Sequence, residues 1–194
     1  MSDRQPVMLM KDVYARLSKF VDEHSREIGR KASFSEAVGV LLKRVGLQYF
    51  VDVPVRNYIL RFLSSVTVHK SILGVILFGS VATGTYEKYS DIDLAFLSSS
   101  NYLETLDLIE SGVNETEEFR KKTLTSEGLF MNVSPLILRP CDSDVLNPIY
   151  FDLIDYGILL FERDLSFTRF LDKFNKIPHS RYLKDSGEVL IWKT

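Results

Sequence analysis

The sequence has almost no cysteine, no long apolar run and almost no net charge, and each absence excludes a class of protein. A single cysteine, Cys141, excludes an internal disulfide framework and is typical of a reducing, cytoplasmic compartment. We expect this residue to be a small, buried apolar side chain. No segment approaches the roughly 18 consecutive apolar residues of a membrane span, and the first residues lack the apolar core of a secretory signal. The sequence therefore predicts a cytoplasmic protein without a membrane segment.

The net charge of −2 excludes binding to nucleic acid through the overall charge of the chain. The charges are nevertheless uneven. Residues 1–50 hold nine Lys and Arg against six Asp and Glu, a net of +3, and subtraction from the totals of 24 and 26 leaves 15 against 20, a net of −5. The first quarter of the chain therefore either faces phosphate or an acidic partner, or is an ordinary solvated surface.

Repeats and low-complexity linkers are also absent, and the 45% hydrophobic and 12% aromatic content is typical of a globular protein. Short apolar and β-branched runs predict strands, which we place at 74–78, 91–97, 129–138, 157–161 and 187–194. Helices are expected at 47–70, after Asn101, at 148–155 and at 167–174, with the charged residues 115–122 on a helix end or loop. Alternating strands and helices indicate an α/β (α+β) sheet protein.

Residues 1–46 are expected to form a small helical segment ahead of a larger domain at 47–194. Apolar residues recur at helical spacing between Val13 and Ile28. A second helix begins near Ser33, which opens a capping-box pattern ahead of another apolar stripe. This stripe must be buried against something, so the segment is expected to associate with a second copy or with the rest of the chain.

The N-terminal segment has two interpretations. A short apolar run at 6–10, a helix, a basic turn and a second helix form an order that resembles the ribbon-helix-helix antitoxins. The residues that carry this resemblance are Val13, Tyr14, Arg16, Leu17, Ser33, Phe34, Ser35 and Glu36. It implies a homodimer that binds DNA through residues 1–46. The alternative is a helical hairpin packed on the rest of the chain, because the run at 6–10 lacks the alternating polar residues that a base-reading strand needs.

A glycine-serine turn between an expected strand and a short helix predicts a phosphate site. Gly79 lets the backbone approach a ligand closely, and Ser80 adds a hydroxyl donor. A helix that opens here, at 81–83, points its first N–H groups and a partial positive charge toward the ligand. Phosphate oxygens suit such a turn, so we expect Gly79 and Ser80 to bind a nucleotide.

Two aspartates follow this turn and predict a metal site. Asp91 and Asp93 are two residues apart on an expected strand, so both carboxylates project from one face. Like charges so close repel each other unless a cation neutralises them. Mg²⁺ (or Mn²⁺) takes one or two carboxylates and completes its shell with water and substrate phosphates. The sequence therefore predicts a metal–nucleotide site in which Asp91 and Asp93 are metal ligands and catalytic residues.

The whole run resembles the signature of the DNA polymerase β nucleotidyltransferase superfamily, a G-S-x-A-x-G motif followed by S-D-x-D-[LI]. The matching residues are Gly79, Ser80, Ala82, Gly84, Ser90, Asp91, Asp93 and Leu94. The resemblance covers residues 55–194 and is to the small prokaryotic, especially archaeal, nucleotidyltransferases and the minimal nucleotidyltransferase antitoxins. It implies a mixed β-sheet flanked by helices, a nucleotide contact from Ser90, a divalent metal, and transfer of a nucleoside monophosphate from a nucleoside triphosphate such as ATP.

The chain departs from the superfamily in its third carboxylate, which a later strand usually supplies and which is often cast as the base that activates the acceptor hydroxyl. The expected strand at 129–138 contains no acid, and Asn132 and Ser134 occupy the alternate positions where it is expected. Acids lie only just outside this strand, at Glu127, Asp142 and Asp144. Three alternatives stay open: the base comes from elsewhere, the substrate supplies it, or the protein binds nucleotide without efficient turnover.

Some other residues carry a weaker signal. The three histidines are scattered, without metal-ligand spacing. Tyr86, Lys88 and Tyr89 lie between the glycine-serine turn and the aspartates, where a side chain either touches a base or triphosphate or, for the tyrosines, fills the core and the loop. Trp192 is expected to complete a core.

Two hypotheses of different class follow. The first is an enzyme, a Mg²⁺-dependent nucleotidyltransferase whose acceptor is a small molecule, an RNA end or a protein side chain, including that of a partner toxin. The second is a catalytically weak antitoxin or regulatory protein that binds a toxin partner and, through residues 1–46, DNA.

Overall fold

The computed structural model describes residues 18–19, 21–22, 25–26, 31, 51–184 and 187–192. The chain divides into two compact units, Met1–Val45 and Gly46–Thr194. In the first unit, residues 18–19, 21–22 and 25–26 are helical, within the range where the sequence predicts the first helix. The expected strand at 6–10 and the expected second helix lie outside the described residues.

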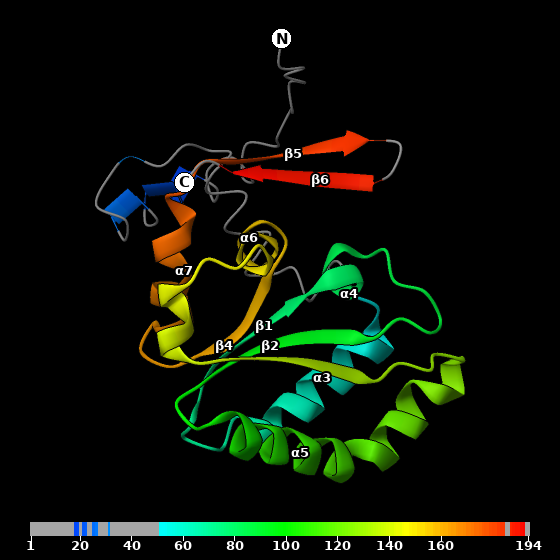
Figure 1. Ribbon diagram of the computed structural model, residues 1–194. Coiled ribbons are helices and arrows are strands. Elements are labelled where there is room, and N and C mark those ends of the chain that lie inside the picture. Colours follow the sequence, from blue (N-terminus) through cyan, green and yellow to red (C-terminus); the bar gives the residue numbers. More distant parts are fainter. Residues whose placement is uncertain are drawn as a thin grey trace. The chain divides into compact units, whose positions relative to one another are not determined.

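A four-stranded mixed sheet organises the second unit (Figure 1). Its strands are β1 (Ile72–Phe78), β2 (Ile92–Ser98), β3 (Val133–Leu138) and β4 (Ile158–Glu162), in the order β3-β2-β1-β4. β1 runs antiparallel to both β2 and β4, whereas β2 and β3 are parallel. The mixed sheet flanked by helices that the family resemblance implies is confirmed.

Helices cover both faces of this sheet, which is why its strands read as nearly continuous apolar runs. On one face lie α3 (Val53–Val66) and α5 (Tyr102–Thr123), and on the other lie α6 (Ile149–Asp155) and α7 (Ser166–Asn175) (Figure 1). Alternate strand residues divide between the two cores. Ile92, Leu94 and Phe96 of β2 pack toward α3 and α5, whereas Ala95 and Leu97 pack toward α6 and α7.

The helix ends follow local sequence signals. α3 has Pro54 in its first turn, where a missing N–H costs nothing. α5 begins after Asn101, whose side chain accepts a hydrogen bond from Glu104 N at 3.0 Å. The basic residues of its last turn favour a helix C-terminus. Residues 115–122 therefore lie within α5, which continues to Thr123.

Two strands begin later than the sequence predicts. β2 begins at Ile92, so Asp91 lies just before the strand rather than in it. β3 begins at Val133 rather than at 129. The reason is that a 3₁₀ turn at Thr125–Glu127 and the left-handed Gly128, with a φ of 75°, redirect the chain before it joins the sheet.

Cys141 and the C-terminal hairpin also differ from expectation. Cys141 is exposed, not buried, because it lies in the 3₁₀ segment Pro140–Asp144, which turns away after β3.

The last strand, β6 (Gly187–Trp192), pairs antiparallel with β5 (His179–Lys184). The sequence does not predict β5, because its polar and charged residues show no strand-like alternation. The ring of Trp192 lies 5.9 Å from that of Phe151 in α6.

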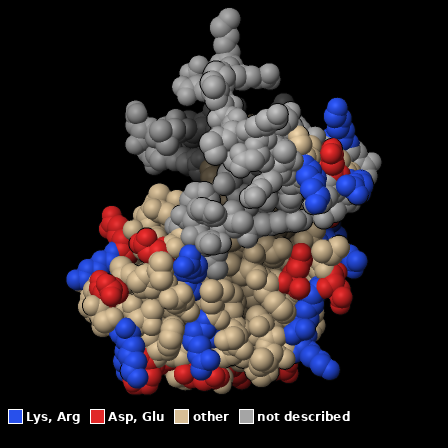
Figure 2. All heavy atoms as spheres, turned by 180° about the vertical axis from the view of Figure 1, so that it is seen from behind, with Lys and Arg blue, Asp and Glu red and all other residues tan. Residues whose placement is uncertain are grey.

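The described part of the face seen in Figure 2 shows no dominant charge. On the face seen in Figure 2, acidic and basic side chains lie interspersed, and among the residues drawn in colour neither sign forms a continuous patch. Within the described ranges, no helix combines the length and the apolar character needed to cross a membrane.

Candidate functional site

The turn after β1 forms one side of the candidate site. The short helix α4 (Gly79–Thr83) begins directly at Gly79, and it ends at Gly84, whose φ is 73°. Thr85 N donates a hydrogen bond to Ser80 O at 2.9 Å and closes the turn. The strand–turn–helix order that the sequence predicts here is confirmed.

Gly79 and Asp93 meet although they belong to separate elements. Phe78 of β1 pairs with Asp93 of β2, so Gly79 follows directly beside this carboxylate. The φ of Gly79 is 69°, in the left-handed region that favours glycine. A Cβ at this position would lie well under 3.0 Å from Asp93 Oδ2, closer than real Cβ atoms come. Glycine is therefore the residue that lets the turn and the carboxylate share this space.

Asp93 is half-buried, and its surroundings disfavour the charged form. Burial raises the pKa of its carboxyl above the ordinary value of 3.8, the nearby hydroxyl of Ser134 lowers it, and the charge of Asp91 raises it further. Asp91 itself is exposed. A carboxylate that is costly to ionise and has a second carboxylate beside it is a group that a bound cation would stabilise.

β3 places Ser134 next to Asp93. The two residues are paired in the parallel register of β2 and β3, so their side chains lie on the same face of the sheet. Asn132 precedes β3 and is exposed, and its backbone oxygen accepts a hydrogen bond from Ile92 N at 2.8 Å. A hydroxyl thus lies beside the aspartate, at one of the two positions where a third acid is expected from the sequence. The roles of Asn132 and Ser134 in binding stay predictions.

No third carboxylate joins the pair in the described part of the chain, where no group of three or more His, Cys, Asp or Glu could hold a metal ion. The acids that flank β3 have other partners or positions. Asp142 Oδ2 accepts a hydrogen bond from Arg139 N at 2.8 Å, and Asp144 Oδ1 pairs with Lys173 Nζ at 3.0 Å. Glu127 lies in the 3₁₀ turn before β3. The donors of the site are therefore two aspartates with neighbouring hydroxyls, a set of oxygen ligands that suits Mg²⁺ or Mn²⁺.

The two serines of the signature differ in their contacts. Ser90 Oγ accepts a hydrogen bond from Glu87 N at 2.8 Å and so holds the loop that leads to Asp91. The hydroxyl of Ser80, by contrast, has no hydrogen-bond partner among the residues that the structure describes. Ser80 is therefore the more available of the two for a ligand.

The loop between α4 and β2 carries aromatic residues whose partners the sequence does not show. Tyr86 donates a hydrogen bond from its hydroxyl to Asp52 Oδ2 at 2.6 Å, and burial raises its pKa to about 12. Tyr89 is instead 72% exposed and stacks on Phe130, with ring centroids 5.6 Å apart. Sequence reasoning missed Phe130, because no local signal marks it and only the pairing of β2 with β3 brings it to this loop.

A comparison with known protein families shows which family this chain belongs to. Residues 57–160 match the nucleotidyltransferase domain. The matched range is more than half of the chain and contains the glycine-serine turn, both aspartates and β3. The chain belongs to the nucleotidyltransferase family.

Individual relatives share only a low sequence identity with this chain. "Putative protein adenylyltransferase MJ1305" of Methanocaldococcus jannaschii is 26% identical over 109 residues, which cover 55% of this chain and 69% of that protein. Among solved structures, a mutant of the toxin-antitoxin MntA-HpeT has a TM-score of 0.41 at 16% identity, over 61% of this chain and 83% of that one. A toxin-antitoxin with AMP-PNP has a TM-score of 0.40 at 16% identity, with the same coverage of 61% and 83%. These two structural likenesses are too weak to bear on function.

Proposed function

We propose that this protein transfers a nucleoside monophosphate from a nucleoside triphosphate, ATP in the first instance, to a hydroxyl acceptor in the presence of Mg²⁺. The observation that carries the proposal is the juxtaposition of Gly79 and Asp93, which sets a glycine-serine turn against a half-buried carboxylate. Such a turn suits phosphate, and such a carboxylate suits the cation that accompanies the phosphates. Membership of the nucleotidyltransferase family supports the same class of reaction.

Each residue of the site has a proposed role. The backbone at Gly79 and the hydroxyl of Ser80 bind triphosphate oxygens. Asp91 and Asp93 hold the cation, and the hydroxyl of Ser134 orients the Asp93 carboxylate from the neighbouring strand. When bound, Mg²⁺ neutralises charge on the triphosphate and on the leaving pyrophosphate.

The proposed reaction is a displacement at the α-phosphorus. The acceptor oxygen forms a new P–O bond, and the bond from the α-phosphorus to the oxygen bridging the β-phosphate breaks. Pyrophosphate leaves with that electron pair. The proton of the acceptor passes to water, since no third carboxylate adjoins the aspartates within the described residues.

A protein side chain is the proposed class of acceptor. The support is the sequence similarity to the relative named a protein adenylyltransferase, at 26% identity over 69% of its length. A serine, threonine or tyrosine hydroxyl would serve as the attacking oxygen.

The test is the transfer of label from α-³²P-ATP, with Mg²⁺, to this protein itself or to protein from the gene next to its own. We expect the wild type to produce a labelled protein band. Asp93→Asn should lower the rate at least about a hundredfold, the scale seen when one electrostatic group of an active site is removed. Asp107→Asn, at an exposed position on α5, is the matched control and should leave the rate unchanged.

Binding of ATP gives the second measurement. By calorimetry, Asp91→Asn and Asp93→Asn should each weaken binding of ATP in Mg²⁺ by at least about tenfold, or about 1.4 kcal/mol. Binding without a divalent cation should change much less or even improve, because each substitution also removes a carboxylate that repels the triphosphate. Equal affinity for Mg²⁺ and ATP in all three proteins would falsify the metal-site assignment and the function built on it.

A second candidate function is that of a catalytically weak antitoxin or regulator, which binds a toxin protein and, through residues 1–46, DNA. The absence of a third acid beside Asp91 and Asp93 within the described residues favours it. Under this hypothesis the wild type forms a stable complex with the protein of the neighbouring gene, and Asp93→Asn forms the same complex. Label transfer that depends on Asp93 would reject it.

A further inference from the structure

A small aromatic and cationic surface lies at the rim of the candidate site. Tyr89 and Phe130 stack with their ring centroids 5.6 Å apart and their planes 20° apart. They are 72% and 43% exposed, respectively. The ammonium of Lys88 lies over both rings, 5.2 Å from the Tyr89 centroid and 5.0 Å from the Phe130 centroid. We refer to these three residues as the aromatic platform.

The register of the sheet fixes where the platform lies relative to the aspartates. β2 and β3 pair in parallel from Ile92 opposite Val133. Continuing that register by three residues brings Tyr89 opposite Phe130, in agreement with the stacking of their rings. Tyr89 precedes Asp91 by only two residues, in a turn that Ser90 N closes by donating a hydrogen bond to Glu87 O at 3.1 Å. The platform therefore directly precedes the carboxylate pair along the chain.

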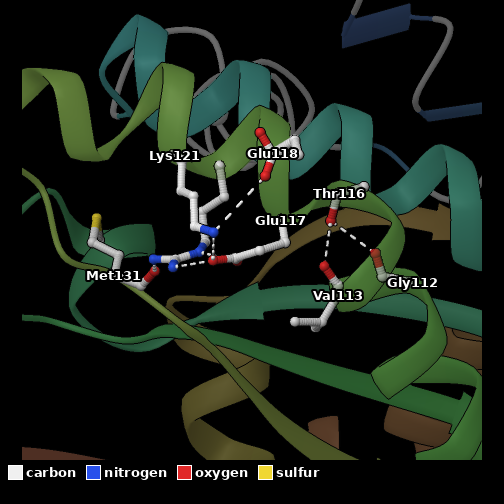
Figure 3. A network of polar contacts seen from close by, with 8 residues as sticks. Gly112, Val113, Thr116, Glu117, Glu118, Lys121 and Met131 are labelled. Atoms are coloured by element: carbon white, nitrogen blue, oxygen red, sulfur yellow. Dashed lines mark hydrogen bonds and ion pairs between the residues drawn. The ribbon is translucent and has the colours of Figure 1, made fainter.

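Two anchors hold the platform in place without a ligand. Phe130 N donates a hydrogen bond to Lys88 O at 2.8 Å, which ties the two loops together. The next residue, Met131, is fully buried, and its backbone oxygen accepts a hydrogen bond from Arg120 Nη1 at 3.2 Å (Figure 3). Arg120 is in turn held by two hydrogen bonds to Glu117, at 2.7 and 2.8 Å. These hydrogen bonds and the stacking of the two rings hold the platform in place, which lowers the ordering cost when it binds.

The chemistry of the platform selects a planar ring. Tyr86, in the same loop, uses its hydroxyl to bind Asp52 and packs against the core, so it is structural. Tyr89 leaves most of its ring in water. An exposed aromatic face gains most from stacking with another flat π-system, and a lysine beside it favours a ligand that carries negative charge. A nucleotide has both features.

We propose that the aromatic platform of Lys88, Tyr89 and Phe130 binds a nucleobase by stacking on Tyr89, beside the phosphates held at the turn and the aspartates. The proposal rests on the nucleotidyl-transfer function argued above. The base is that of the triphosphate donor, because the proposed acceptor is a protein side chain. The base of an oligoribonucleotide is the alternative, and two arms of one experiment distinguish the two.

The first arm compares ligands with and without a base. By calorimetry in Mg²⁺, wild-type protein should bind ATP about tenfold more tightly than ribose 5-triphosphate, which lacks the base. Tyr89→Ala should remove this advantage and leave binding of inorganic tripolyphosphate unchanged. Tyr89→Phe should keep the advantage, because the ring and not the hydroxyl does the stacking. Tyr102→Ala, at an exposed tyrosine that begins α5, is the matched control and should behave as the wild type.

The second arm uses a short single-stranded oligoribonucleotide, titrated with saturating ATP and Mg²⁺. If Tyr89→Ala weakens binding of the oligoribonucleotide about tenfold and leaves binding of ATP intact, the platform binds the base of a nucleic acid and the assignment to the donor is overturned. If Tyr89→Ala weakens binding of ATP instead, the base is that of the donor. Unchanged affinity for both ligands, with equal wild-type affinity for ATP and ribose 5-triphosphate, overturns the proposal and leaves the metal and phosphate site standing. Failure of the wild type to bind either triphosphate or tripolyphosphate overturns the proposed function itself.

Discussion

At the scale of the single residue, the backbone of Gly79 lies directly against the carboxylate of Asp93. A side chain at position 79 would therefore displace this carboxylate. The glycine is needed twice, once for its φ of 69° and once because a side chain would meet the carboxylate. Burial and the charge of Asp91 disfavour the charged form of the aspartate. The site therefore places a residue that needs a positive φ, Gly79, next to a carboxylate whose ionisation is disfavoured, Asp93.

We expect Gly79→Ala to cost more stability than Gly128→Ala. Both glycines have a positive φ, but a Cβ at Gly128 meets nothing within 4 Å. Gly128→Ala should cost about 1 kcal/mol from backbone strain alone. Gly79→Ala adds the displacement of Asp93 and should cost at least about 2 kcal/mol in urea unfolding. Equal costs would mean that the turn and the carboxylate are not in contact in solution.

Asp93→Asn should stabilise the protein at neutral pH when a chelator removes divalent cations. The pKa of Asp93 is raised by folding, so the folded protein keeps this proton to higher pH than the unfolded chain does. The contribution of Asp93 to stability is therefore most favourable below the ordinary pKa of 3.8 and is lost as the pH rises through the raised pKa of the folded protein. The advantage of the variant should be small at acid pH and grow above that range in urea unfolding. A variant less stable than the wild type at neutral pH would contradict this.

At the scale of secondary-structure elements, Arg163 joins the ends of α3, β1 and β4. Its Nη2 donates to Thr67 O at the end of α3 at 2.6 Å, and its Nε donates to Ile72 O at the start of β1 at 3.1 Å. Its backbone N donates to Leu73 O at 2.8 Å, directly after β4. The planar guanidinium presents Nε and Nη2 in a fixed fork that reaches both carbonyls at once, a geometry that the single ammonium of lysine does not reproduce.

Arg163→Lys should therefore destabilise the protein by about 1–3 kcal/mol, because a half-buried carbonyl loses its donor. Arg139→Lys is the control, since Arg139 is 52% exposed and pairs with Asp142 at the surface. It should change the free energy of unfolding by less than about 1 kcal/mol. Chemical denaturation of both variants gives the comparison, and a loss no larger for Arg163→Lys than for Arg139→Lys would show that the three elements are held together by their apolar contacts alone.

At the scale of the whole molecule, the chain divides into Met1–Val45 and Gly46–Thr194, and the charge is divided too. Residues 1–50 have a net charge of +3 in a chain whose total is −2. The basic N-terminal segment and the sheet domain thus differ in their electrostatic character, which suits them to different partners.

We predict that residues 1–46 mediate self-association. A chain that begins at Leu47 should have a lower molecular mass per particle in light scattering than the full chain, because the apolar stripe after Ser33 is removed. It should keep its thermal unfolding transition, because the sheet and its two cores lie beyond residue 50. Retention of the full-length oligomeric state would show that the segment only packs on its own chain.

Local patterns in the sequence determined the elements and the chemical groups of this protein. The apolar runs of β1 and β2, the glycine that follows β1, and the spacing of Asp91 and Asp93 all depend on neighbours within a few residues, so they can be read without the fold. The family signature spans one strand–turn–helix–strand unit and has the same local character. The first residues of β2 and β3 could not be predicted as accurately, because the turns that precede these strands compete with strand propensity.

Only the tertiary structure decided which groups meet. Ser134 lies beside Asp93, and Phe130 lies on Tyr89, because β2 and β3 pair in parallel in one register. A shift by one residue would turn every side chain of β3 to the opposite face. That register is set by burial of both faces of the sheet under α3, α5, α6 and α7, a property of the whole domain that no local stretch of sequence contains.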